Sequence, residues 1–225
     1  DEILEQVKQI DKSGCEKILL TAGDNFEMAP LDYIKQIIEK INQKYNKITL
    51  DLSIAPLSTE QCQQVSNWNI GTYHICQESY HQAAYQRMHA QGPKSDYYSR
   101  LYSIDKAIEG GIKDFGLGIL LGLYDWRYEV VSLIEHAKYI SNKYGIGPKA
   151  VSIPKMESQE GSILSKFPPY MVLDEQFLKI IAVLRLVLPN TEIILPTKET
   201  PEITKIACEV GVTCTLANPE KYALV

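Results

Sequence analysis

The feature that most constrains the fold is a regular alternation of short apolar runs with longer amphipathic runs along the 225 residues. Each short run is rich in Ile, Leu or Val and is bounded by turn residues, which predicts a β-strand. Helical patterns lie between these runs, and strands that alternate with helices form parallel sheets with right-handed crossovers. The predicted strands are 18–23, 48–55, 70–77, 114–122, 150–156, 192–198 and 213–218.

The number and order of these elements indicate an incomplete barrel. The first predicted element is a helix, whereas a closed (β/α)8 barrel begins with a strand. We therefore expect an α/β fold of the (β/α) TIM type with about seven strands and the first strand missing, as one partial domain over 1–225. Its sheet would be open beside 18–23, which is unfavourable for an isolated domain. The predicted helices are 1–13, 31–45, 101–109, 126–144, 173–188 and 201–210.

Several predicted strands carry an apolar face and a polar or glycine-rich face. The outer helices of a barrel cover the apolar face, so we expect the other face to point into the lumen. A lumen of this kind has room and polarity for a ligand, although a hydrogen-bonded polar core would give the same pattern. The polar face includes Asp51, Ser53, Thr72, His74, Cys76, Gly116, Gly118 and Gly122.

Composition excludes several classes of protein. The net charge of −5 argues against nucleic-acid binding. No apolar run has the length of a bilayer-spanning helix, and the acidic start is not a secretory signal. Five scattered cysteines predict reduced thiols in the cytoplasm. None of them has C-x-x-C spacing, so no metal or cluster site is expected within the chain.

The most specific motif is the segment from Gly71 to His81, G-T-Y-H-I-C-Q-E-S-Y-H. It resembles the G-T-Y-x-x-x-Q-E-T-Y-H segment of the aromatic-amino-acid (tyrosine) lyase branch of radical S-adenosylmethionine enzymes. That branch includes the thiazole-synthesis lyase ThiH and the [FeFe]-hydrogenase maturase HydG. The similarity extends over nearly the whole chain, and G-I-G-P at 145–148 is closest to the HydG branch. Further matching segments are 92–96, 105–107, 116–125, 180–186 and 195–199.

The resemblance implies a small tyrosine-like substrate, S-adenosylmethionine and a [4Fe–4S] cluster. The family's cluster ligands are C-x3-C-x2-C after the first barrel strand, and this chain does not contain them. Either the chain is truncated or the protein has lost its cluster. The resemblance also implies cleavage of tyrosine by 5′-deoxyadenosyl radical chemistry, with hydrogenase- or thiamine-assembly proteins as possible partners. Catalytic residues are not assigned, and a second C-terminal cluster is not visible.

The resemblance also assigns cofactor-binding residues. Asp24 stands where the family has a glutamate that contacts the amino group of the cofactor, although a turn or cap role fits an aspartate equally. Glu78 follows the third strand, at the face where barrel sites form. Glycine near the adenine would let a flat base approach the backbone, but tight packing would also select it. The full cofactor set is Asp24, Ser53, Glu78, Tyr80, His81, Arg100, Gly116, Gly118 and Leu120.

The candidate substrate residues depart from the family pattern. Lys155 and Glu157 lie in P-K-M-E-S, where the lyases have P-R-L-R-P. Thr197 and Lys198 lie in P-T-K-E, where the lyases have S-T-R-E. Lysine offers a carboxylate a point charge instead of the paired hydrogen bonds of arginine. We expect Lys155, Thr197 and Lys198 to contact the substrate.

Three functions follow from these observations. The first is a radical S-adenosylmethionine carbon–carbon lyase, and the second is a homologue without a cluster that acts as a binding or assembly protein. The third is an aldolase-like or phosphate-binding barrel, but the loops after the last two strands lack the glycines that such a site uses. Convergence of His74, Glu78 and His81 on a metal is not expected, because a strand-to-loop segment separates them.

Overall fold

The computed structural model describes residues 2–158, 163–196 and 199–215, without the side chains of residues 163 and 164. Within these residues, seven strands form a sheet in the order of the chain; the first three strands pair in parallel, as do the last four. Each predicted strand is confirmed, and the first six are shorter than expected. The strands are β1 Lys17–Thr21, β2 Thr49–Ser53, β3 Tyr73–Cys76, β4 Phe115–Gly118, β5 Ala150–Ser152, β6 Glu192–Leu195 and β7 Cys214–Thr215.

The helices fall between the strands, as a (β/α) barrel requires. The predicted helix 101–109 is divided at Tyr102, and the short helices before it were not predicted. The helices are α1 Glu2–Lys12, α2 Leu31–Lys44, α3 Thr59–Val65, α4 Gln82–Met88, the 3-10 helix η1 Pro93–Ser95, α5 Tyr97–Leu101, α6 Ser103–Glu109, α7 Trp126–Tyr144, α8 Ile163–Lys166, α9 Asp174–Val187 and α10 Pro201–Val210.

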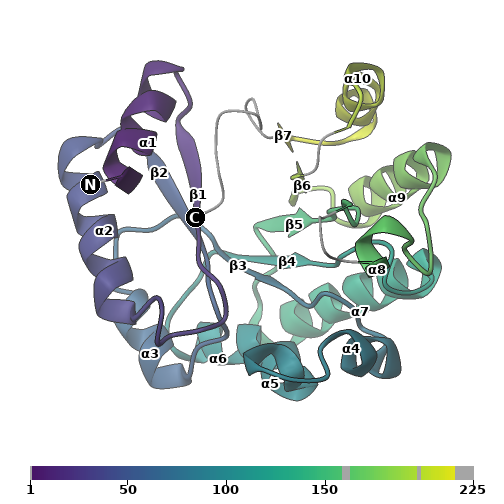
Figure 1. Cartoon of the computed structure of the whole chain (residues 1–225), viewed down its shortest axis with the longest axis horizontal. Helices are drawn as coiled ribbons and strands as arrows, with labels where there is room; N and C mark the ends of the chain where they lie inside the picture. Colours follow the sequence, from purple (N-terminus) through teal and green to yellow (C-terminus); the bar gives the residue numbers. More distant parts are fainter. Residues whose placement is uncertain (1, 159–162, 197–198, 216–225) are drawn as a thin grey trace. The chain divides into compact units, whose positions relative to one another are not determined.

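The chain divides into two compact units, which we describe separately. Unit 1 is the described part of Asp1–Ile75 and Tyr102–Phe115, and unit 2 is the described part of Cys76–Leu101 and Gly116–Leu216. In unit 1, β1 pairs with β2 over five residues, and α1 and α2 lie beside each other against these strands (Figure 1). The apolar stripe of α2 is buried through Ile34, Ile38 and Ile41, as its periodicity predicts.

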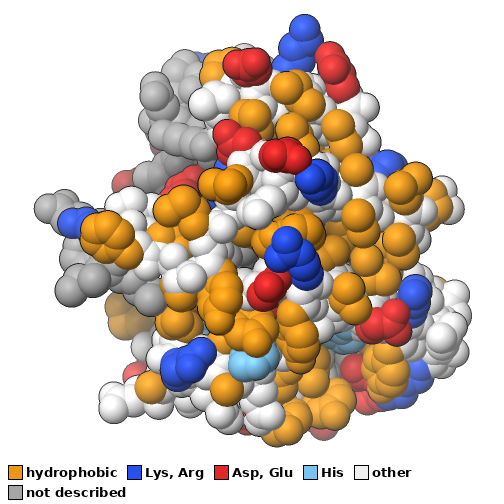
Figure 2. All heavy atoms as spheres, turned by 90° about the vertical axis from the view of Figure 1, so that its right-hand side faces the viewer, with side chains coloured by type: hydrophobic (Ala, Val, Ile, Leu, Met, Phe, Trp, Pro, Cys, Tyr) orange, Lys and Arg blue, Asp and Glu red, His pale blue; other side chains and the backbone are white. Residues whose placement is uncertain are grey.

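In unit 2, α9 packs between α7 and α10, and Arg185 on α9 fixes the loops at its end. The Arg185 guanidinium donates to the carbonyl groups of Leu188, Pro189, Thr191 and Gly211. Apolar side chains also gather on the face shown in Figure 2. Exposed apolar side chains of this unit include Phe167, Met171, Leu173 and Leu186.

The described helices differ from a membrane span in length or in hydropathy. Among the described residues, none is both long enough and apolar enough to cross a bilayer.

Candidate functional site

A strained turn directly after β3 is the centre of the candidate site. Glu78 has a φ of 66°, and it is the one residue other than glycine with a positive φ among the described residues. The Ser79 N–H donates to the Gln77 carbonyl over 2.9 Å, which closes a three-residue turn around Glu78. A γ-turn with a positive central φ is rare and strained. Strain of this kind persists only where surrounding contacts enforce it, and it gathers at functional sites.

The Glu78 side chain is buried and carries an ion pair. Its carboxylate accepts a hydrogen bond from Lys94 Nζ at 2.9 Å, while its carbonyl accepts one from Leu120 N–H at 2.8 Å. The Tyr85 hydroxyl donates to the Lys94 carbonyl over 2.6 Å and thus fixes the backbone that carries the lysine. The turn therefore presents a carboxylate at the carboxyl end of β3, where barrel enzymes bind their ligands.

A second, buried carboxylate, on α7, accepts hydrogen bonds from the turn. Glu129 has an exposure of 0%, and it accepts hydrogen bonds from Ser79 Oγ at 2.5 Å and from Tyr80 N–H at 2.7 Å. Burial raises the pKa of Glu129, although the hydrogen bonds from Ser79 and Tyr80 oppose the rise.

Tyr80, His81 and Arg100 are all engaged in contacts within unit 2. The Tyr80 hydroxyl lies 2.8 Å from His136 Nδ1, and burial raises the pKa of this phenol well above its usual value. His81 Nδ1 accepts from Ala84 N–H and caps α4, while its ring stacks on Tyr124 at 3.7 Å. Arg100 is buried and donates to the Cys76 carbonyl at 2.9 Å. These three residues shape the β3 loop, and their contact with a cofactor stays a prediction.

Of the candidates in and after β4, Gly118 and Leu120 bond to the Glu78 turn. Gly116 and Gly118 are in β4, and Leu120 follows it and bonds to the Glu78 carbonyl. A Cβ added to Gly118 would lie 2.9 Å from the Ser152 carbonyl oxygen and 3.3 Å from Cys76 Sγ. This contact supports the alternative that close packing selects glycine at 118.

The two candidates in unit 1 lie at the carboxyl ends of its strands. Asp24 is half-buried in the loop that follows β1, and Ser53 ends β2. The Ser53 carbonyl accepts a hydrogen bond from Ala22 N–H at 3.0 Å. Their proposed contact with the cofactor also stays a prediction.

Polar side chains on neighbouring strands of unit 1 meet at Asp51, as the face pattern predicts. The Asp51 carboxylate accepts from Thr72 N–H at 2.8 Å, lies 3.2 Å from His74 Nε2 and lies 3.7 Å from Lys17 Nζ. Burial alone would raise the pKa of this carboxylate, but the contacts with His74 and Thr72 outweigh burial and lower it.

Lys155, the described member of the substrate set, lies in the wall of a cavity in unit 2. The cavity has a volume of about 350 Å³, and Met156, Glu157 and Glu199 also line it. Lys155 Nζ lies 2.6 Å from the Glu199 carboxylate and 3.1 Å from the Asp174 carboxylate. Thr197 and Lys198 lie outside the described residues.

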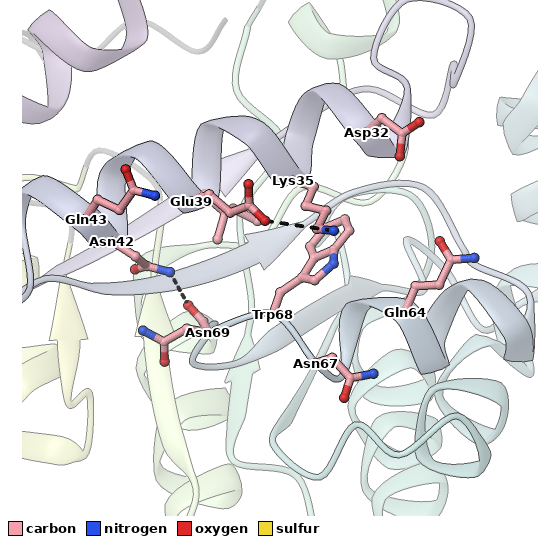
Figure 3. Close-up of a pocket in the computed structure, with 10 residues that line it drawn as sticks. Asp32, Lys35, Glu39, Asn42, Gln43, Gln64, Asn67, Trp68 and Asn69 are labelled. Atoms are coloured by element: carbon pink, nitrogen blue, oxygen red, sulfur yellow. Dashed lines mark hydrogen bonds and ion pairs between the residues drawn. The ribbon is translucent and has the colours of Figure 1, made fainter.

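A larger cavity, of about 660 Å³, lies in unit 1 between α2 and the segment that follows α3 (Figure 3). Trp68 and several side-chain amides line it, and Asn42 Nδ2 donates to the Asn69 carbonyl across it at 2.8 Å. The segment 67–69 leads into β3, so this wall lies toward the amino end of the strand. Barrel active sites form at the opposite end, so we do not assign the reaction to this cavity.

The described residues contain no group of three or more His, Cys, Asp or Glu side chains that could hold a metal ion. His74 contacts Asp51, His81 caps α4 and Glu78 pairs with Lys94, so these three residues serve separate roles. The five cysteines are free thiols in five different elements or loops. The described residues therefore do not fit an iron–sulfur cluster.

Comparison with known proteins supports the family resemblance of the 71–81 segment, which runs from β3 to the start of α4. The chain is 31% identical over 202 residues to 2-iminoacetate synthase of Salmonella typhimurium, a match that covers 89% of this chain and 52% of the relative. It superimposes on a crystal structure of HydG, a maturase of the [FeFe]-hydrogenase, with a TM-score of 0.90 and 36% identity, over 94% of this chain and 48% of HydG. The chain belongs to the radical S-adenosylmethionine family of HydG and 2-iminoacetate synthase.

Two further matches concern a domain of the chain and its fold. Residues 152–221 match the Biotin and Thiamin Synthesis associated domain. Methylornithine synthase (PylB) has the same fold, with a TM-score of 0.71 and 18% identity over 94% of this chain and 59% of that protein. The expected incomplete (β/α) barrel is thus confirmed. The chain spans about half the length of the curated relatives it matches.

Sequence reasoning missed Glu129, which has the most buried carboxylate around the turn. A signal was present, because Glu129 lies on the helical stripe of α7 that also carries Leu133 and Ile140. A charged residue on a buried apolar stripe requires a hydrogen-bonding partner. The partner of Glu129 is the 71–81 segment, which carries the family motif.

Proposed function

We propose that this chain supplies the S-adenosylmethionine-binding and substrate-binding barrel of a radical S-adenosylmethionine lyase that cleaves tyrosine or a related amino acid. The strained Glu78 turn carries this proposal. A carboxylate at a strand's carboxyl end, held in a costly backbone conformation, has the placement and charge to bind a ligand ammonium.

S-adenosylmethionine fits the donors and acceptors of this turn. Glu78 would accept a hydrogen bond from the ammonium of the methionine part, while Lys94 orients the carboxylate. Gly116, Gly118 and Leu120 are the proposed neighbours of the adenine, and Tyr80, His81 and Arg100 shape the turn. Bound S-adenosylmethionine supplies the 5′-deoxyadenosyl group that abstracts hydrogen in this family. Since the described residues do not fit a cluster, no step is assigned to one.

Lys155 is the proposed partner of the substrate carboxylate. It already has two carboxylate neighbours, of which Glu199 is buried, with 6% of its side chain exposed, and Asp174 is exposed, at 57%. The ion pair with the exposed partner is the weaker one, because solvent screens it. We therefore propose that a substrate carboxylate replaces Asp174 at Lys155, with Thr197 and Lys198 as further candidates. Cytoplasmic location and hydrogenase- or thiamine-assembly partners remain predictions.

The test uses the full-length protein, prepared anaerobically with iron and sulfide. We expect release of 5′-deoxyadenosine and p-cresol from S-adenosylmethionine, tyrosine and a reductant, and loss of both products in Glu78→Ala. The matched control is Glu135→Ala, which removes an exposed glutamate paired with Lys138 on α7. Binding of S-adenosylmethionine without any 5′-deoxyadenosine would favour the non-catalytic homologue and contradict the lyase.

A further inference from the structure

The turn that carries Glu78 is held in place by hydrogen bonds from several elements, which we call its anchors. Its carbonyl groups are held by Leu120 N–H, at Glu78, and by the Tyr97 hydroxyl, which donates to the Tyr80 carbonyl at 2.8 Å. The Tyr80 N–H donates to Glu129 on α7 instead. Anchors on both sides are what a strained backbone requires to persist.

Glu129 supplies the anchor on the α7 side. Its two carboxylate oxygens accept from Ser79 Oγ and Tyr80 N–H, which belong to the two residues that follow Glu78. Ser79 Oγ also accepts from His81 N–H at 3.2 Å, so the donors form one connected network. A completely buried carboxylate is costly unless it is hydrogen-bonded, and here every hydrogen bond goes to the turn.

We propose that Glu129 is a positioning residue that enforces the backbone of the turn and thereby aims the Glu78 carboxylate at the ligand ammonium. This inference rests on the proposed binding of S-adenosylmethionine at Glu78. Glu129 does not touch the ligand in this account, and it acts through Ser79 and Tyr80. Each carboxylate oxygen accepts from one donor, Ser79 Oγ or Tyr80 N–H, whereas the amide of a glutamine would offer one acceptor oxygen in place of two.

The first readout is the turn itself, without any ligand. In Glu129→Gln the Tyr80 N–H meets either a neutral amide oxygen in place of a charged carboxylate oxygen or the NH2 group, so its hydrogen bond is weakened or lost. Hydrogen exchange of the Tyr80 amide in the full-length protein should accelerate by about tenfold. Ser79→Ala, which removes one donor and leaves the carboxylate, should accelerate it less. Glu135→Gln, on the exposed face of the same helix, should leave it unchanged.

The second readout is the affinity for S-adenosylmethionine, measured by isothermal titration calorimetry on the full-length protein. Loss of a charged hydrogen-bond acceptor should weaken binding by about tenfold in Glu129→Gln. In a Glu78→Ala background the same change should alter the affinity by less than about twofold, because the group that Glu129 positions is gone.

The outcomes separate this inference from the proposed function. If Glu78→Ala binds S-adenosylmethionine as tightly as the wild type, Glu78 does not bind the ligand ammonium and the proposed function is wrong. If Glu78→Ala weakens binding but Glu129→Gln does not, only the positioning role fails. If Glu129→Gln weakens binding equally in both backgrounds, Glu129 has a general structural role and the inference is wrong.

Discussion

Replacement of Glu78 by glycine should relieve the backbone strain of the turn, whereas replacement by alanine should not. Both replacements should weaken ligand binding to the same extent. Both changes remove the carboxylate and its ion pair with Lys94, which is partly exposed and contributes about 1 kcal/mol or less. They differ at the positive φ of 66°, which glycine adopts without a clash and alanine does not. The left-handed conformation costs a residue with a Cβ about 1–2 kcal/mol.

We therefore expect Glu78→Gly to be more stable to unfolding than Glu78→Ala by about 1 kcal/mol, after the greater chain entropy of glycine is subtracted. In a protein of this size the difference corresponds to a Tm higher by about 2 °C. Both variants should lose affinity for S-adenosylmethionine equally.

The control for this comparison is Glu135, which lies in the interior of α7. There the order should reverse, with alanine more stable than glycine by about 1 kcal/mol, because glycine is a poor helix former. Differential scanning fluorimetry of the four full-length variants measures both comparisons. A Glu78→Ala variant at least as stable as Glu78→Gly would show that the turn is not strained, and the reasoning would be refuted.

Three further predictions concern other parts of the chain. Asp51→Ala should destabilise the protein by about 2 kcal/mol at neutral pH, because Thr72 N–H loses a buried acceptor. This difference, read from melting curves at several pH values, should shrink below the unfolded aspartate pKa of about 3.9 as pH falls through the lower folded-state pKa. Gly71→Ala should destabilise by about 1–3 kcal/mol in urea unfolding, because its Cβ would lie 2.5 Å from Asp51 Oδ1. Asp174→Asn should lower the KM for a carboxylate substrate by about twofold by removing one of the two carboxylates that compete for Lys155, with no effect on the corresponding amide.

The positions of the strands and of the long helices followed from the sequence, because their apolar periodicity is local. The predicted helix 126–144 has the bounds of α7, and 201–210 has those of α10. The helix α3 was missed although its capping box, Ser58 with Gln61, is a sequence signal. The cap of α4 is the imidazole of His81, which is outside the usual set of capping residues, so its start could not be read.

The site was predicted less completely, because its contacts join distant parts of the chain. The motif identified Glu78, but no sequence rule places a glutamate in the left-handed region, where glycine is expected. The acceptor that enforces this conformation, Glu129, is 50 residues from Ser79. Likewise, the ion pairs of Lys155 depend on Asp174 and Glu199, which local patterns do not connect to it.

The most direct test of the central claim is a crystal structure of the full-length protein with S-adenosylmethionine bound. We predict a Glu78 carboxylate oxygen within about 2.7–3.2 Å of the ligand's amino group, on a turn that keeps its positive φ. A bound S-adenosylmethionine whose amino group lies beyond hydrogen-bond distance of Glu78 would contradict the account.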